Sequence, residues 1–118
     1  MRIFKTKRFS KFAKKAGITD TALKEAARQV ESFTDLGGDV YKLRFARDGE
    51  GKSGGYRFIL FFKQDDKLFF KYLFSKSNRA NIRDDELKEF KDDAKTMLSL
   101  TNEQIEFQKK LCHLMELQ

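Results

Sequence analysis

Apolar side chains recur at helical spacing near the start of the chain. One face of a helix over residues 7–16 holds Phe9, Phe12, Ala13 and Ala16. A second stripe, with the i, i+3, i+4, i+7 spacing of a buried helix face, consists of Leu23, Ala26, Ala27 and Val30. Gly17 suits the end of the first helix, and Thr19 or Asp20 suits the cap of the second. The pattern predicts an N-terminal helical hairpin, and residues 2–5 before it fit a short strand.

The hydrophobic period changes to two from residue 40. A strand over residues 40–46 separates its side chains by face, with Tyr41, Leu43 and Phe45 on one and Lys42 and Arg44 on the other. Residues 56–63 are apolar on both faces except at Arg57, which predicts a central strand covered on both sides. A tight turn at residues 64–66 leads into a third strand at 67–74. Three strands with short links predict an antiparallel β-meander.

The period returns to helical after residue 83. Asp84, Asp85 and Glu86 stand where a helix N-terminus favours anions. The apolar stripe of this helix consists of Leu87, Phe90, Ala94, Met97 and Leu98. Thr101 with Gln104 is the signature of a capping box, and Ile105, Leu111, Leu114 and Leu117 give the tail an apolar face. We therefore expect one α+β domain, with a core over residues 1–98 and a C-terminal helical extension over residues 99–118.

The composition excludes several functional classes. The 118 residues include one Cys and one His, which excludes a disulfide framework and a cysteine-based zinc site. The single His113 also argues against a histidine metal centre or a Ser-His-Asp triad. No apolar run approaches the roughly 20 residues that span a bilayer, and no secretory signal follows the basic N-terminus. We expect a cytoplasmic protein that uses neither a metal nor a cofactor.

The positive charge is concentrated in the first half of the chain. The formal net charge is +7, from 25 Lys and Arg against 18 Asp and Glu. Residues 61–118 hold equal numbers of basic and acidic side chains, so the whole excess lies in residues 1–60. Such asymmetry points to a polyanionic partner, either a nucleic acid or an acidic protein.

Five cations are predicted to lie close together at one end of the meander. They are Lys42 and Arg44 on the first strand, Lys52 in the loop, Arg57 on the second strand and Lys76 after the third. We expect them to meet in one pocket sized for a ribose-phosphate, because arginine and lysine bind phosphate oxygens. Two plainer interpretations stay open. Arg57 pairs with Asp39, Asp48 or Glu50, or Lys42 and Arg44 form an ordinary solvent-exposed face of a sheet.

Two stretches of the chain resemble a known family. Residues 40–62, VYKLRFARDGEGKSGGYRFILFF, resemble the central segment of bacterial RelE/HigB-type toxins of type II toxin–antitoxin modules. Residues 67–90 resemble the final strand, basic loop and C-terminal helix of the same family. The likeness rests on the combination of K-x-R in one strand, G-K-x-G-G-[YS]-R opening the next, and K-x-N/S after the third.

This resemblance implies a fold similar to that of microbial ribonucleases and a metal-independent endoribonuclease activity. Such toxins cut messenger RNA on the ribosome through the RNA 2′-OH, leaving a 2′,3′-cyclic phosphate and a 5′-OH, and so inhibit translation. Carried over by position, the catalytic set is Arg57, Arg44, Lys76 and Lys42. The RNA-binding set is Lys52, Arg47, Arg79 and Ser77. Ser77 stands where some members have a second arginine, and no tyrosine near residues 82–87 matches the one that aids cleavage in the best-known members.

The same resemblance implies a protein partner, a cognate antitoxin whose acidic or apolar segment covers the basic cleft or the sheet. Two other functions stay open on the sequence. One is a non-nucleolytic toxin of the related ParE branch, which poisons gyrase through protein contacts. The other is an RNA-binding module that leaves RNA intact and binds with a steep salt dependence.

Overall fold

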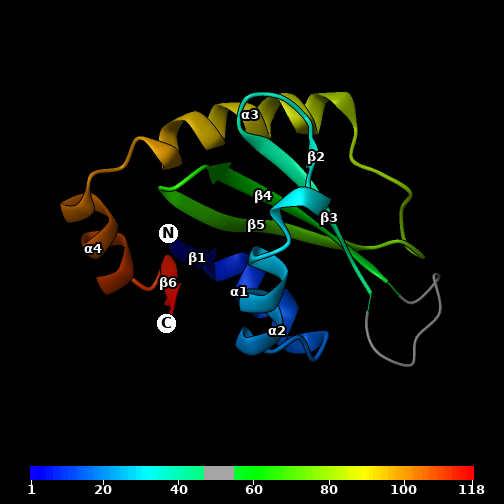
Figure 1. The fold of residues 1–118 in the computed structure, drawn as a ribbon, viewed down its shortest axis with the longest axis horizontal. Helices are drawn as coiled ribbons and strands as arrows, with labels where there is room; N and C mark the ends of the chain where they lie inside the picture. Colours follow the sequence, from blue (N-terminus) through cyan, green and yellow to red (C-terminus); the bar gives the residue numbers. More distant parts are fainter. Residues whose placement is uncertain (47–54) are drawn as a thin grey trace.

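The computed structural model describes residues 1–46 and 55–118, and over these residues the chain forms an α+β fold (Figure 1). The strands are β1 (Arg2–Thr6), β2 (Thr34–Asp35), β3 (Val40–Phe45), β4 (Tyr56–Lys63), β5 (Lys67–Ser75) and β6 (Leu114–Leu117). The α-helices are α1 (Lys7–Lys15), α2 (Asp20–Ala27), α3 (Asp84–Leu98) and α4 (Asn102–Lys110), with a 3-10 turn at Val30–Ser32. In the described ranges, no helix combines the length and the apolar character that crossing a membrane requires.

The predicted antiparallel meander is confirmed as the centre of the sheet. The sheet order is β2-β3-β4-β5-β1-β6, with β4 antiparallel to both β3 and β5. On β4, Phe58, Leu60 and Phe62 face one apolar cluster and Ile59 and Phe61 face another, and all five side chains are buried. The central strand is therefore covered on both sides, as its unbroken apolar sequence indicates.

The two N-terminal helices form where the sequence predicts them. Gly17 follows α1 with a φ of 72°, a left-handed conformation that glycine adopts at little cost. The Thr19 side chain accepts a hydrogen bond from the Ala22 amide at 3.1 Å and caps α2. Both helices contribute to the apolar cluster with Phe58, but α1 packs chiefly on β5 and β1. The expected hairpin arrangement is therefore not confirmed.

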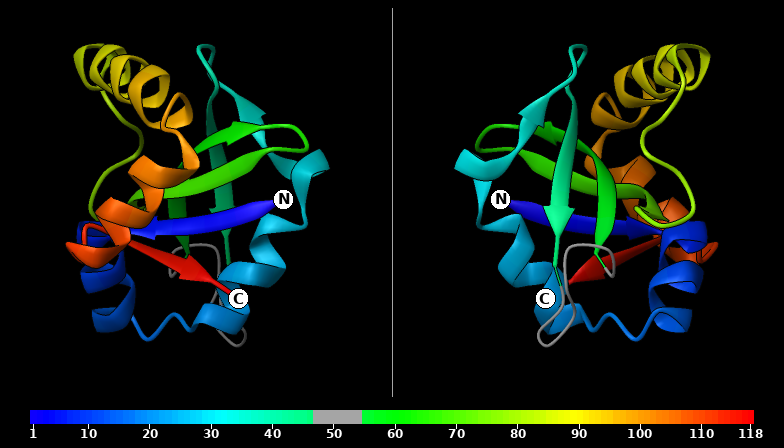
Figure 2. Two further views of the ribbon diagram at one scale, coloured as in Figure 1. Left: turned by 90° about the vertical axis from the view of Figure 1, so that its left-hand side faces the viewer. Right: turned by 90° about the vertical axis from the view of Figure 1, so that its right-hand side faces the viewer.

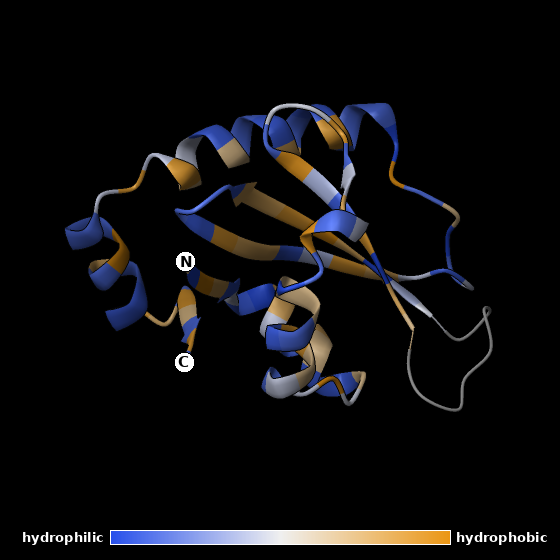
Figure 3. Cartoon of the chain, in the orientation of Figure 1, coloured by the Kyte–Doolittle hydropathy of each residue, from blue (hydrophilic) through white to orange (hydrophobic). Residues whose placement is uncertain are grey.

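α3 covers the other face of the sheet, as Figure 1 shows. Its apolar stripe is the predicted one, with Ala94 and Leu98 buried and Leu87, Phe90 and Met97 packed against the same cluster. The hydropathy colouring of Figure 3 shows α3 alternating between polar and apolar residues above a largely apolar sheet. The capping box of α4 is also present, because Thr101 Oγ1 accepts from the Gln104 amide and Gln104 Oε1 accepts from the Thr101 amide.

The two ends of the chain depart most from the predicted layout. β1 pairs in parallel with β5, which makes the sheet mixed, and β6 pairs antiparallel with β1 (Figure 2). The expectation of a wholly helical tail is wrong beyond Lys110, because the chain reverses at Cys112 with a φ of 62°. Leu114 and Leu117 are then buried from a strand and not from a helix.

A cluster of ion pairs fastens β6 to β1. Arg2 Nε lies 2.8 Å from Glu116 Oε2, and Arg2 Nη2 lies 2.9 Å from Glu106 Oε2. Lys109 Nζ lies 2.9 Å from Glu116 Oε1. The hydrogen bond from Arg2, followed by the one from Lys109, lowers the pKa of Glu116 to about 2 despite its partial burial.

This ion-pair cluster predicts that Glu116 stabilises the fold in a pH-dependent way. The pKa of Glu116 is about 2 in the folded protein and about 4.3 in an unfolded chain. The stabilisation is thus complete above about pH 5 and is lost as the pH falls toward 2. Glu116→Gln should lower the free energy of unfolding by about 1–2 kcal/mol at pH 7 and flatten its decline in acid. Urea unfolding at pH 7 and pH 3 measures both effects.

Glu89→Gln is the matched control, since Glu89 is an exposed glutamate on α3. It should leave the unfolding curves unchanged at both pH values. Equal stability of Glu116→Gln and the control at pH 7 would contradict a role for the Arg2–Glu116 pair.

Candidate functional site

Arg44 and Arg57 lie directly opposite each other on neighbouring strands. In the antiparallel register Arg44 pairs with Arg57, and Arg57 pairs in turn with Phe74 on β5. Side chains at such paired positions share a face, with Cβ atoms about 5 Å apart. The face is the one that α3 covers, because Ile59 and Phe74 belong to the apolar cluster beneath α3. The sheet therefore places two guanidinium groups side by side next to an aromatic ring.

Lys42 extends this group along β3. It lies two residues before Arg44 and so projects from the same face, opposite the buried Ile59 of β4. Arg44 is exposed, whereas Lys42 and Arg57 are partly exposed. We call the side chains of Lys42, Arg44 and Arg57 the basic face. All three residues lie on strands of the sheet, β3 and β4.

The basic face carries positive charge without an acidic partner among the described residues. Within residues 1–46 and 55–118, no carboxylate lies within 4.0 Å of the three cationic groups. Arg57 Nη1 instead donates to the carbonyl oxygen of Tyr56 at 3.4 Å. The ion pair of Arg57 with Asp39 is therefore not formed, while Asp48 and Glu50 lie outside the described residues. Such a surface attracts an anion, because each positive group raises the potential felt by the next.

The remaining predicted residues lie near the same end of the sheet or outside the described ranges. The Lys76 amide donates to the Gly55 carbonyl at 3.2 Å, which holds the end of β5 beside the start of β4, and the Lys76 side chain is exposed. The hydroxyls of Ser77 and Ser75 are 2.7 Å apart, so Ser77 takes part in the turn. Lys52 and Arg47 lie outside the described residues. Whether all five cations meet in one pocket therefore stays a prediction.

Arg79 differs from the basic face because its charge is already compensated. Its guanidinium forms an ion pair with Glu86 of α3, donates to the Tyr72 hydroxyl at 3.4 Å and lies 5.5 Å from the centroid of the Phe74 ring. The hydrogen bond from Arg79, followed by one from the Arg83 amide, lowers the pKa of Glu86 to about 2. Glu86 in turn raises the pKa of Arg79. Arg79 thus ties the loop after β5 to both the sheet and α3.

Tyr72 and Phe74 are two aromatic residues of this surface that sequence analysis does not single out. The Tyr72 ring lies 6.0 Å from Phe74 and 5.8 Å from Phe90 of α3, measured between centroids. Strict alternation along β5 assigns both rings to the opposite face of the sheet. A bulge reverses this, because Leu60 pairs with Phe70 while Ile59 pairs with Tyr72, leaving Lys71 as the extra residue. The positive Lys71 inside an apolar strand is the one sequence signal of the bulge.

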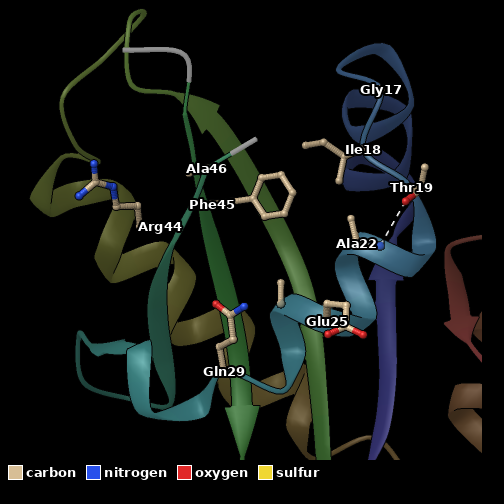
Figure 4. A pocket seen from close by; sticks show the side chains of 10 residues that line it. Gly17, Ile18, Thr19, Ala22, Glu25, Gln29, Arg44, Phe45 and Ala46 are labelled. Carbon is tan, nitrogen blue, oxygen red and sulfur yellow. Dashed lines mark hydrogen bonds between the residues drawn. The ribbon is translucent and has the colours of Figure 1, made fainter. Parts of the chain in front are cut away.

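The pocket drawn in Figure 4 belongs to the other face of the sheet. It has a volume of about 400 Å³ and lies between the Gly17–Thr19 turn, α2 and the end of β3. Arg44 contributes to its wall, but Figure 4 shows the Arg44 side chain pointing away from Phe45 and α2. The pocket is therefore separate from the basic face.

A comparison with protein families identifies the family of the chain. A family model described as the RelE toxin of the RelE/RelB toxin–antitoxin system matches residues 1–117. None of the curated proteins compared with the chain matches it. The family match covers every strand of the sheet, including the three that carry the basic face and Phe74, and the chain belongs to the RelE toxin family.

Proposed function

We propose that this toxin is a ribosome-dependent endoribonuclease that cleaves messenger RNA and thereby inhibits translation in the cytoplasm. One observation carries the proposal: Arg44 and Arg57 lie opposite each other on rigid strands, with no carboxylate beside them in the described ranges. Two forked guanidinium groups at this spacing suit a single phosphate, because each donates two parallel hydrogen bonds to anionic oxygens.

In the proposed reaction the RNA supplies its own nucleophile. The 2′-oxygen forms a bond to the adjacent phosphorus while the bond from phosphorus to the 5′-oxygen breaks. The products are a 2′,3′-cyclic phosphate and a 5′-OH. Negative charge builds on the non-bridging oxygens as the bond forms, and Arg44 and Arg57 stabilise this charge from fixed positions.

Two protons must also move, one from the 2′-OH and one to the 5′-oxygen. Arginine stays protonated in proteins, so neither Arg44 nor Arg57 serves as the base. We assign the proton transfers to the catalytic lysines, Lys42 on β3 and Lys76 after β5. Binding of the RNA on either side is assigned to Lys52, Arg47, Arg79 and Ser77.

The antitoxin of the module is the proposed protein partner. Arg44 is exposed, Arg57 is partly exposed, and no described carboxylate compensates them, so an acidic antitoxin segment laid over Arg44 and Arg57 neutralises the same charge that phosphate does. Inhibition by occlusion follows, because one surface cannot hold both ligands.

Removing the Arg57 guanidinium should abolish the toxic activity. Arg57→Ala should slow cleavage of ribosome-bound messenger RNA by about 10²–10³-fold, the usual effect of losing one donor to a developing anion. Primer extension of cellular RNA after brief induction, with a kinase assay for 5′-OH ends, measures the loss. Lys63→Ala is the control, since it removes an exposed cation from the other end of β4. A folded Arg57→Ala protein with undiminished toxicity would rule out the proposed role.

Arg44 and Arg57 should also act as a unit. If both hold one phosphate, Arg44→Ala should slow cleavage by about 10–100-fold alone but add much less in the Arg57→Ala background. A double-mutant cycle on single-turnover cleavage rates measures this coupling. Rate losses that simply multiply would show that the two arginines act on separate groups.

A further inference from the structure

A second basic surface lies beyond the edge of β5, on the side away from Arg44. β1 pairs with β5 only as far as Phe70, and the chain then turns into α1 at Lys7. The last part of β5 therefore has a neighbouring strand on one side only. A groove of about 500 Å³ opens there between β5, α1 and the loop after Ser75. We call it the side groove.

The side groove is cationic and aromatic. Its positive charge comes from Arg8 and Lys15 of α1, while Arg79 of the loop, paired with Glu86, adds hydrogen-bond donors; the described lining itself contains no carboxylate residue. Arg8 and Lys15 are seven residues apart and therefore lie on the same side of α1. The Arg8 guanidinium carbon lies 5.6 Å from the centroid of the Phe12 ring. An aromatic side chain can stack on a base, and the cations beside it can bind the phosphate of the same nucleotide.

The side groove is continuous with the basic face. Phe74 lines the groove and is also the residue of β5 that pairs with Arg57, and Arg79, another lining residue, lies over the Phe74 ring. The path from Arg44 across Arg57 and Phe74 to Arg8 thus carries cations and aromatic rings. Its carboxylates lie on the α3 side, where Glu86 pairs with Arg79 and where Glu89 and Asp93 line a neighbouring cavity with Arg8 and Tyr72. A single polyanionic strand fits such a path, because its phosphates and bases alternate along its length.

We propose that the side groove binds the single-stranded RNA that adjoins the scissile phosphate. Arg8 and Lys15 hold phosphates, and the aromatic wall receives a base. This assignment rests on the proposed ribonuclease function, because it places the bound RNA next to the phosphate that the basic face would hold. RNA is favoured over an acidic peptide because the groove combines stacking surfaces with charge and continues into the basic face.

The test is the binding of a fluorescein-labelled 2′-O-methyl RNA heptamer to the full-length protein, measured by anisotropy at several salt concentrations. This probe lacks the 2′-OH nucleophile and stays intact. Arg8→Ala/Lys15→Ala should bind it about tenfold more weakly, and the salt slope should fall by about 1.4, or 0.7 for each lost phosphate contact. Thermal melts establish that the variant is folded.

Lys11→Ala/Lys14→Ala is the matched control, because it removes two exposed cations from α1 that do not line the groove. It should bind the heptamer within twofold of the wild type. Equal weakening of both double variants would overturn the proposal and leave only general attraction to the net charge. Unchanged heptamer affinity with lost antitoxin binding would overturn it in favour of a protein ligand.

The same measurements separate the groove from the cleavage chemistry. If the wild type cuts no messenger RNA but binds the heptamer more tightly than Arg8→Ala/Lys15→Ala does, the result would support RNA binding in the groove and reject the proposed ribonuclease. Normal cleavage and normal heptamer affinity in Arg8→Ala/Lys15→Ala would reject the groove and keep the ribonuclease.

Discussion

The burial of β4 on both faces is the constraint on which the rest of the structure depends. Phe58 and Leu60 fill one apolar cluster, while Ile59 and Phe61 fill the other. A slip of one residue against a neighbouring strand would exchange the two faces, so the register is strongly fixed. Arg57 is the first charged position on this strand, and its place opposite Arg44 follows from apolar packing farther along β4. The positively charged groups are thus held together by the core, against their mutual repulsion.

Local sequence patterns predict the part of the basic face that lies on regular strands. Alternation alone places Lys42 and Arg44 away from Leu43, and an unbroken apolar run marks β4 as central. The features that the sequence does not reveal are non-local. The bulge at Lys71 turns Tyr72 toward α3, which depends on packing against that helix.

The ends of the chain are non-local in the same sense. The sequence of β6 taken alone predicts a continuation of the preceding helix, and its pairing with β1 makes it a strand. The parallel pairing of β1 with β5 is equally invisible in the sequence of either strand, because parallel partners leave no turn signal between them. The pairing of the strands that carry Lys42, Arg44 and Arg57 is better predicted than the sheet edges, because these strands are neighbours in sequence.

Arg79 and Glu86 form a neutral corner between two positive surfaces. Their ion pair joins the loop after β5 to the first turn of α3, and the Phe74 ring lies beneath the guanidinium. This ion pair therefore gives both surfaces a wall and hydrogen-bond donors without adding net charge. Among residues 1–46 and 55–118, the charge without a carboxylate partner therefore concentrates at Arg44 and Arg57 on one side and at Arg8 and Lys15 on the other.

The joining of β1 to β5 and β6 has a consequence for the order of folding. Phe4 of β1 is fully buried in a cluster that includes Phe69 of β5 and Leu114 of β6. Contacts so distant in sequence form late, because closing long loops precedes any gain from pairing. The β3–β4–β5 meander, whose partners are neighbours in sequence, can therefore pair before β1 and β6 join its edge and bury Phe4.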